Sequence, residues 1–279
     1  YDEDKWPSGF AGGKVPLMSE EFHARCLTKI DKNDRISKGD QLLYEDDKFK
    51  YIIHKARMGN AWFNGTAYDD LLNPNMVKAF IDSAYVPYLE RYKKDLGKTV
   101  PGIFTDEPQV SPRVSGGKEG SVSFSPYLIE KFQKMHGYDI VSNVPSLLDT
   151  IGHFQKVRYD YYQTLSRCFE ENYTKQIGEY CANHNAIFTG HLNGEESFSS
   201  TMFNSGNSMV NYRHMQMPGM DHLGLHYLPL NVPKSVASVA NQYGISLRLC
   251  ESYGISVQHV NFEDRHLLLD FLTLNGVNF

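Results

Sequence analysis

Two short stretches of the chain place acidic side chains directly after an apolar run. Residues 102–104 precede Asp106 and Glu107, and residues 247–250 precede Glu251. Short apolar runs bounded in this way indicate buried parallel strands, and α/β proteins place their chemistry where such strands end. Glu107 and Glu251 are therefore the first candidates for a catalytic pair of carboxyl groups.

The other predicted strand ends carry side chains that suit a carbohydrate. Aromatic rings stack on the apolar faces of sugars, carboxylates and amides bind hydroxyl groups, and two acids flank the bond that is cut. The predicted substrate-binding residues are Asp106, Trp6, Asn60, Trp62, His191, Asn193, Asp221, His222 and Tyr253.

Several of these side chains have structural alternatives. Asp106 could hydrogen-bond the amides of its own loop, and one of the adjacent Glu195 and Glu196 is expected to face solvent or a helix N-terminus. His222 and His226 would face one another on a helix and could bind zinc. The Leu-Gly-Leu sequence between them is a poor helix, which argues against that zinc pair.

Helices separate the predicted strands. The first is predicted from Asn73, a helix cap followed by Pro74, to Gly97. Further helices are expected at about 125–136, 154–184, 233–243 and 261–275, and strands near residues 51, 101, 186, 217, 247 and 277. This alternation predicts parallel strands joined by right-handed crossovers.

The resulting fold prediction is α/β, a (β/α)₈ TIM barrel that lacks its first strand and helix. Residues 1–279 would form a single catalytic domain, with residues 14–50 as a small excursion or hairpin insertion. An open sheet is the alternative, but no glycine-rich phosphate loop marks a dinucleotide site.

Composition narrows the classes of partner. The 279 residues carry a formal net charge of −5 and contain no block of basic residues, so neither nucleic acid nor an anionic membrane is an expected partner. No run of about 18 apolar residues predicts a membrane span. The four cysteines lie far apart among apolar residues, and we expect free thiols more than a disulfide or zinc framework.

Four separated segments carry a resemblance to a known family. They are LLNPNMVKAFIDSAYVPYLERYKKDLGKTVPGIFTDEPQV, TGHLNGEES, MQMPGMDHLG and LCESYGISVQHVNFEDRHLLLDFLTLNGVNF, at residues 71–110, 189–197, 215–224 and 249–279. The chain resembles the catalytic barrel of the α-L-rhamnosidase-like glycoside hydrolases, family 106, over nearly its whole length. The accessory β-domains of those enzymes are absent from this sequence.

The resemblance implies inverting hydrolysis of a terminal deoxyhexose, such as an α-L-rhamnoside, often assisted by Ca²⁺. Glu107 in FTDEP would be the general acid and Glu251 in CESYG the general base. Burial beside Asp106 would help keep Glu107 protonated. Glu195, Glu196 and the acidic residues 2–4 are the candidate calcium ligands.

Two other functional classes stay open. The chain could be a non-catalytic carbohydrate-binding barrel or an inactive fragment, or it could be a metal-dependent hydrolase that uses its histidines. The expected partner is an oligosaccharide or glycoside, in a setting of bacterial-type polysaccharide degradation. An extracellular or periplasmic location is slightly favoured over a cytoplasmic one.

Overall fold

The computed structural model describes residues 19–279 apart from residues 64, 226–228 and 257–259, and it describes Trp62 by its backbone only. The chain divides into two compact units. Unit 1 comprises Tyr1–Arg91 and Val110–Tyr173, and unit 2 comprises Tyr92–Gln109 and Thr174–Phe279.

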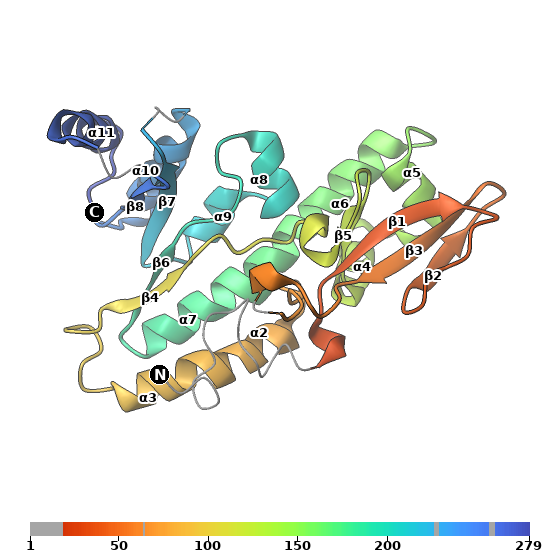
Figure 1. The fold of residues 1–279 in the computed structure, drawn as a ribbon, viewed down its shortest axis with the longest axis horizontal. Helices are drawn as coiled ribbons and strands as arrows, with labels where there is room; N and C mark the ends of the chain where they lie inside the picture. The colour runs from red at the N-terminus through yellow and green to blue at the C-terminus, as the bar shows by residue number, and fades with distance from the viewer. Residues whose placement is uncertain (1–18, 64, 226–228, 257–259) are drawn as a thin grey trace. The chain divides into compact units, whose positions relative to one another are not determined.

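Unit 1 contains an antiparallel sheet of four strands in the order β2-β3-β1-β5 (Figure 1). The strands are β1 (Arg25–Asp31), β2 (Gln41–Glu45), β3 (Phe49–Lys55) and β5 (Val122–Phe124). Along β1, Cys26 and Leu27 are buried and pair with His54 and Ile53 of β3.

The longer helices of unit 1 pack together through apolar side chains, with α6 in contact with both α4 and α5. Its helices are α2 (Pro74–Phe80), α3 (Val86–Arg91), α4 (Pro126–His136), α5 (Val144–Leu148) and α6 (Phe154–Phe169). A π-helical turn, η3 (Ile81–Tyr85), joins α2 to α3. Shorter 3-10 turns are η1 (Glu20–Phe22), η2 (Ala61–Phe63), η4 (Pro112–Ser115) and η5 (Val141–Asn143).

Unit 2 is built on a curled parallel sheet in the order β4-β6-β7-β8 (Figure 1). Its strands are β4 (Gly102–Thr105), β6 (Ile187–Gly190), β7 (Met217–Leu223) and β8 (Leu249–Gly254). Because these strands are parallel, their carboxyl ends lie along one edge of the sheet. Asp106 and His191 directly follow β4 and β6, whereas Asp221 and Glu251 lie within β7 and β8.

Helices cover the parallel sheet. A π-helical turn, η6 (Glu170–Thr174), runs into α7 (Lys175–Asn183), which packs on β6, and α10 (Asn231–Tyr243) packs on β7. The buried face of α10 includes Val232, Val236 and Val239, at the spacing of three and four residues typical of an amphipathic helix. The remaining helices are α8 (Phe198–Asn204), α9 (Ser208–Tyr212) and α11 (Phe262–Leu274).

The predicted TIM barrel is wrong. Over the described residues the structure has a half-barrel of four parallel strands and a separate antiparallel sheet, which make a mixed α/β fold and not a closed (β/α)₈ barrel. The segment predicted as a parallel strand near residue 51 is β3, which pairs antiparallel with β1 and β2. Alternating apolar residues predict a strand but do not determine its partner or direction.

The predictions made from local sequence patterns agree better with the structure than the predicted barrel does. The side chain of Asn73 accepts hydrogen bonds from the backbone amides of Asn75 and Met76, and Pro74 opens α2, as predicted. Helices also form at the other four predicted segments. Cys26, Cys168, Cys181 and Cys250 are free thiols, as expected. Among the described residues, no helix combines the length and apolar character needed to cross a membrane.

Two adjacent aspartates are buried in unit 1, where residues 68–70 run alongside residues 22–24. Asp70 accepts hydrogen bonds from Ser125 Oγ and the Leu72 amide, and Arg25 lies 3.6 Å away. Neither oxygen of Asp69 has a hydrogen-bond partner among the described residues. Burial, together with the charge of Asp70, raises the pKa of Asp69 to about 8. A raised pKa in the folded state means that ionisation of Asp69 destabilises unit 1.

Asp69→Asn should therefore stabilise the protein increasingly as the pH rises. The carboxyl group contributes most favourably below its unfolded pKa of 3.8, and that contribution is lost as the pH rises through about 8. Thermal melting between pH 5 and 9 should show a gap in Tm between variant and parent that widens up to about pH 8 and then levels off. The corresponding difference in unfolding free energy should be on the order of 1 kcal/mol or more.

Asp82→Asn is the control, because Asp82 is an exposed aspartate of unit 1 that pairs with Lys78 one helical turn away. It should leave Tm nearly unchanged at every pH. A gap for Asp69→Asn that stays constant with pH would contradict the assignment of Asp69 as the titrating group.

Candidate functional site

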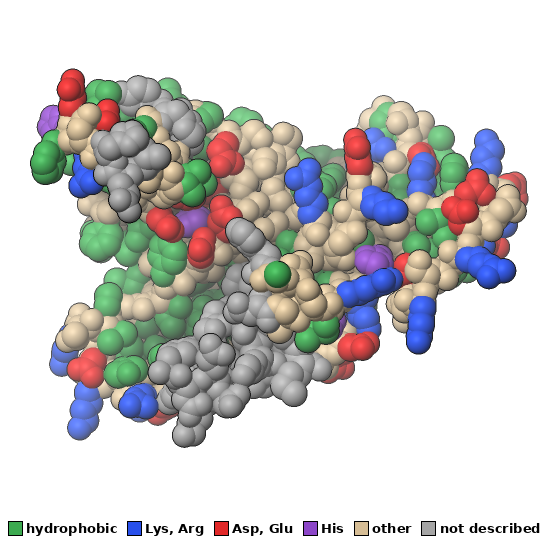
Figure 2. Space-filling view, viewed as in Figure 1, with side chains coloured by type: hydrophobic (Ala, Val, Ile, Leu, Met, Phe, Trp, Pro, Cys, Tyr) green, Lys and Arg blue, Asp and Glu red, His purple; other side chains and the backbone are tan. Residues whose placement is uncertain are grey.

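The strand ends of unit 2 bring four carboxylates together around one imidazole. Asp106, His191 and Glu251 form one group, and Glu107, His191 and Asp221 form another; within each group the potential ligand atoms lie within 4.8 Å of one another. We call the four acids the acid cluster. Figure 2 shows acidic side chains and a histidine gathered on the surface, over the end of β4.

Close approach of β4 and β6 sets the position of His191. Thr105 pairs with Gly190, and the His191 amide donates to the Thr105 carbonyl at 3.2 Å. Gly190 has φ +127°, and a Cβ there would lie 1.9 Å from the Thr105 oxygen. Only glycine fits this position, so the two strands can approach closely directly before Asp106 and His191.

The pairing of β7 with β8 places the other two acids. Asp221 and Glu251 are directly paired in this parallel ladder, so their side chains lie on the same face of the sheet. The neighbouring Cys250 and His222 belong to the opposite face, where His222 is fully buried.

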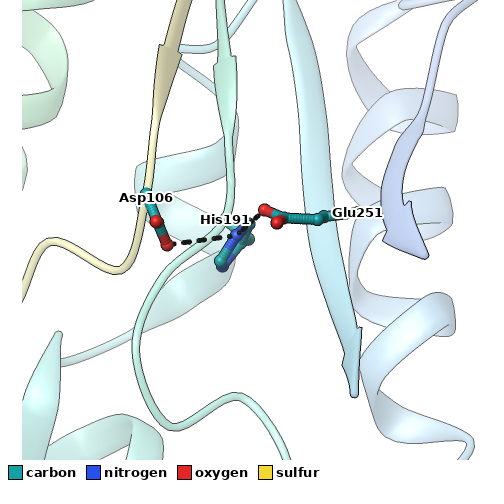
Figure 3. Close-up of side chains that lie close together, drawn as sticks. All are labelled: Asp106, His191 and Glu251. Atoms are coloured by element: carbon teal, nitrogen blue, oxygen red, sulfur yellow. Dashed lines mark hydrogen bonds and ion pairs between the residues drawn. The ribbon is translucent and has the colours of Figure 1, made fainter. Parts of the chain in front are cut away.

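His191 is the buried centre of the cluster, and it lies between Asp106 and Glu251 (Figure 3). Its Nε2 is 2.9 Å from Glu251 Oε2 and 3.6 Å from Asp106 Oδ1. The buried Nδ1 has no hydrogen-bond partner among the described residues. A tautomer with the proton on Nε2 therefore satisfies the ring best, and Nε2–H donates to Glu251.

The two acids beside His191 differ in exposure. The side chain of Asp106 is 74% exposed and that of Glu251 is 46% exposed, whereas that of His191 is 2% exposed. Water screens Asp106 strongly, so its 3.6 Å contact contributes little. The shorter hydrogen bond to Glu251 is the one that orients the ring.

Glu107 is held in an unusual conformation. Its φ is +48°, in the left-handed region that residues other than glycine rarely adopt, and strain of this kind concentrates at functional sites. Asn193 Nδ2 donates to Glu107 Oε2 at 2.9 Å. Burial raises the pKa of Glu107, the Asn193 hydrogen bond and His191 oppose that shift, and Asp106 and Asp221 add to it.

Asp221 and the neighbouring Glu195 are also affected by burial. Burial raises the pKa of Asp221, with His191 opposing the shift, and Asp221 Oδ1 has no hydrogen-bond partner among the described residues. Glu195 is buried, and its pKa is raised to about 7 by burial, against the hydrogen bonds that it accepts.

The structure brings six of the predicted site residues together. Asp106, Glu107, His191, Asn193, Asp221 and Glu251 meet at one edge of the parallel sheet. Tyr253 follows on β8, where its hydroxyl donates to the Arg265 carbonyl. Asn60 and the backbone of Trp62 belong to unit 1, and Trp6 lies outside the described residues.

The sequence interpretation missed Tyr212. This residue ends α9, is 1% exposed, and donates a hydrogen bond from its hydroxyl to Glu195 Oε1. Nothing in its local sequence marks it, because a tyrosine on a short helix is usually a core residue. The contact appears only when α9 packs beside the loop that follows β6.

The sequence resemblance implies calcium, and the donor atoms present indicate which side chains could hold it. Ca²⁺ takes six to eight oxygen ligands, and the acid cluster offers carboxylate oxygens, including the unpartnered Oδ1 of Asp221. The oxygens of Glu195 already accept three hydrogen bonds from the protein, and Glu196 is exposed and in neither His191 group. The acid cluster fits a hard cation better than Glu195 and Glu196 do.

Comparisons with known proteins support the fold. A scan of models of protein families gave no match, and neither did a search of curated proteins. Among solved structures, the rhamnosidase from Novosphingobium sp. PP1Y is similar, with a TM-score of 0.59 and 18% sequence identity. The match covers 82% of this chain and 22% of that protein. The chain therefore has a rhamnosidase-like fold and spans under a quarter of the length of that rhamnosidase.

Asn193→Ala should raise the pKa of Glu107. The amide of Asn193 donates to the carboxylate and stabilises its ionised form, so removing the amide favours the protonated form. Carboxyl ¹³C NMR of the full chain, recorded across a pH titration, would measure the shift.

Asn241→Ala is the matched control. Asn241 lies on α10, and its side-chain oxygen accepts a hydrogen bond from Arg248 and not from a group of the acid cluster. It should leave the Glu107 titration unchanged. An unchanged or lowered pKa in Asn193→Ala would show that this hydrogen bond does not govern Glu107.

Proposed function

We propose that the chain carries the catalytic acids of a glycoside hydrolase related to the family 106 α-L-rhamnosidases, and that it acts on a terminal deoxyhexose. The observation that carries the proposal is the pairing of two differently placed glutamates around His191 in a rhamnosidase-like fold. Glu107 is half-buried with a raised pKa, whereas Glu251 is more exposed and accepts a hydrogen bond from His191. Two carboxyl groups in different environments are what acid and base roles require.

Glu107 is the proposed general acid. Its raised pKa keeps the proton at higher pH than an ordinary glutamate would, so that it can protonate the leaving oxygen. The strained backbone and the Asn193 amide fix where that proton is delivered. Deprotonation of Glu107 should set the alkaline limit of activity.

Glu251 is the proposed general base. Its half-exposed carboxylate is open to water, and the His191 Nε2–H donates to one of its oxygens. That hydrogen bond orients the carboxylate and leaves its other oxygen to deprotonate an attacking water. Attack opposite the leaving group would invert the sugar's configuration.

The remaining polar groups are proposed to hold the sugar. Asp106, Asp221 and the amide of Asn193 offer acceptors and donors for hydroxyl groups. Calcium, when bound, would be held by carboxylates of the acid cluster, and it would supply positive charge that offsets their repulsion and orients hydroxyl groups.

A metal-dependent hydrolase is a second candidate. It is favoured by the two groups that share His191, since an imidazole with carboxylates suits zinc or manganese better than calcium. Elemental analysis of the purified chain distinguishes the two, because stoichiometric zinc or manganese favours the metal enzyme and its absence favours the two-glutamate hydrolase.

Glu107→Gln and Glu251→Gln should each lower the turnover of p-nitrophenyl α-L-rhamnopyranoside by about a hundredfold or more, because each removes a proton-transfer group. Circular dichroism should show an unchanged fold. Glu107→Gln should also abolish the alkaline limb of the pH profile.

Glu179→Gln serves as the control, since this exposed glutamate of α7 pairs with Lys175 on the same helix. It should keep full turnover. Sugar binding without turnover by the parent chain, surviving both active-site substitutions, would instead support a non-catalytic binding module.

A further inference from the structure

Glu195 is buried, and its hydrogen bonds link the loop after β6 to β7, α9 and α10 of unit 2. Its Oε1 accepts from the Leu192 amide at 2.9 Å and from the hydroxyl of Tyr212 on α9, and its Oε2 accepts from the Asp221 amide at 3.2 Å. Its backbone carbonyl accepts from Asn231 Nδ2 on α10 at 3.4 Å. The side chain therefore bridges the loop after β6 and the end of β7.

The two amides that Glu195 binds are placed beside groups of the acid cluster. Leu192 directly follows His191, and Asp221 is itself a member of the cluster. A carboxylate that holds both amides fixes the separation of the two backbones, and with it the separation of His191 from Asp221. A buried side chain whose two oxygens are both engaged by hydrogen bonds has few other arrangements, so this bridge is stiff.

Tyr212 completes the bridge. Its hydroxyl is buried with the carboxylate, and without that donor Glu195 would lose one of the three groups that offset the cost of burying it. Among the described residues this hydroxyl bonds Glu195 and no member of the acid cluster, so any effect on chemistry must pass through Glu195.

We propose that Glu195 and Tyr212 are a positioning pair that sets the distance between His191 and Asp221, and through His191 the orientation of the base Glu251. The part that concerns Glu251 rests on the proposed function. The part that concerns His191 and Asp221 rests on the hydrogen bonds alone. Glu195 is accordingly assigned to the scaffold of the site and not to a metal.

The test compares Tyr212→Phe with Tyr161→Phe in the full chain. Tyr161 is equally buried, at 2% exposed, and its hydroxyl donates to the Ser123 carbonyl in unit 1, so the control loses the same kind of bond away from the cluster. Glu195→Gln is the second variant, which replaces one acceptor oxygen by an amide donor.

The first readout is the ¹⁵N chemical shift of the His191 imidazole, which needs no activity. Tyr212→Phe and Glu195→Gln should shift the Nε2 signal, and Tyr161→Phe should leave it in place. Equal spectra for Tyr212→Phe and Tyr161→Phe would overturn the proposal. Should Glu195→Gln fail to fold, Tyr212→Phe decides alone.

The second readout is turnover of p-nitrophenyl α-L-rhamnopyranoside. Displacing the base should lower kcat by between about tenfold and a hundredfold, with KM within about twofold of the parent value. A purely structural role would lower Tm and leave kcat of the folded protein unchanged, which would count against positioning. A parent chain without turnover would contradict the proposed function, while the imidazole spectra would still decide the positioning of His191.

Discussion

The site depends on the pairing of four parallel strands, above all on the contact of β4 with β6. The backbone hydrogen bond from His191 to Thr105, made possible by Gly190, brings Asp106 and His191 together before either side chain interacts. The ladder between β7 and β8 does the same for Asp221 and Glu251. Backbone pairing therefore sets where the side chains of the acid cluster begin.

Placing four carboxylates close together is electrostatically unfavourable. The burial of two of them and the exposure of the other two explain how the fold tolerates it. Four carboxylates share one imidazole, and burial raises the pKa of both Glu107 and Asp221. Asp106 and Glu251 are open to water, which screens their charges. The half-buried Glu107 therefore retains its proton more readily than an ordinary glutamate. The proposed division into acid and base rests on this difference in burial between Glu107 and Glu251.

Local sequence patterns predicted the parts of the site that lie on single segments. The acids after a short apolar run correctly indicated the end of β4 at Asp106, and the Asn73 cap marked a real helix. The predicted strand end at Glu251 was wrong, because β8 continues through this residue to Gly254. The closed barrel was wrong because strand direction and partner depend on distant pairing, as when β3 joins β1 in an antiparallel sheet. The Glu195 to Tyr212 contact spans 17 residues and has no local signal.

In the proposed mechanism, Glu107 and Glu251 act as acid and base on opposite sides of a glycosidic bond. The most direct measurement is ¹H NMR of the anomeric signals during the first minutes of α-L-rhamnoside hydrolysis, before mutarotation mixes the anomers. Direct attack by water that Glu251 activates predicts that β-L-rhamnose appears first. Initial release of the α anomer would contradict this account, because it would make one glutamate a nucleophile and not a base.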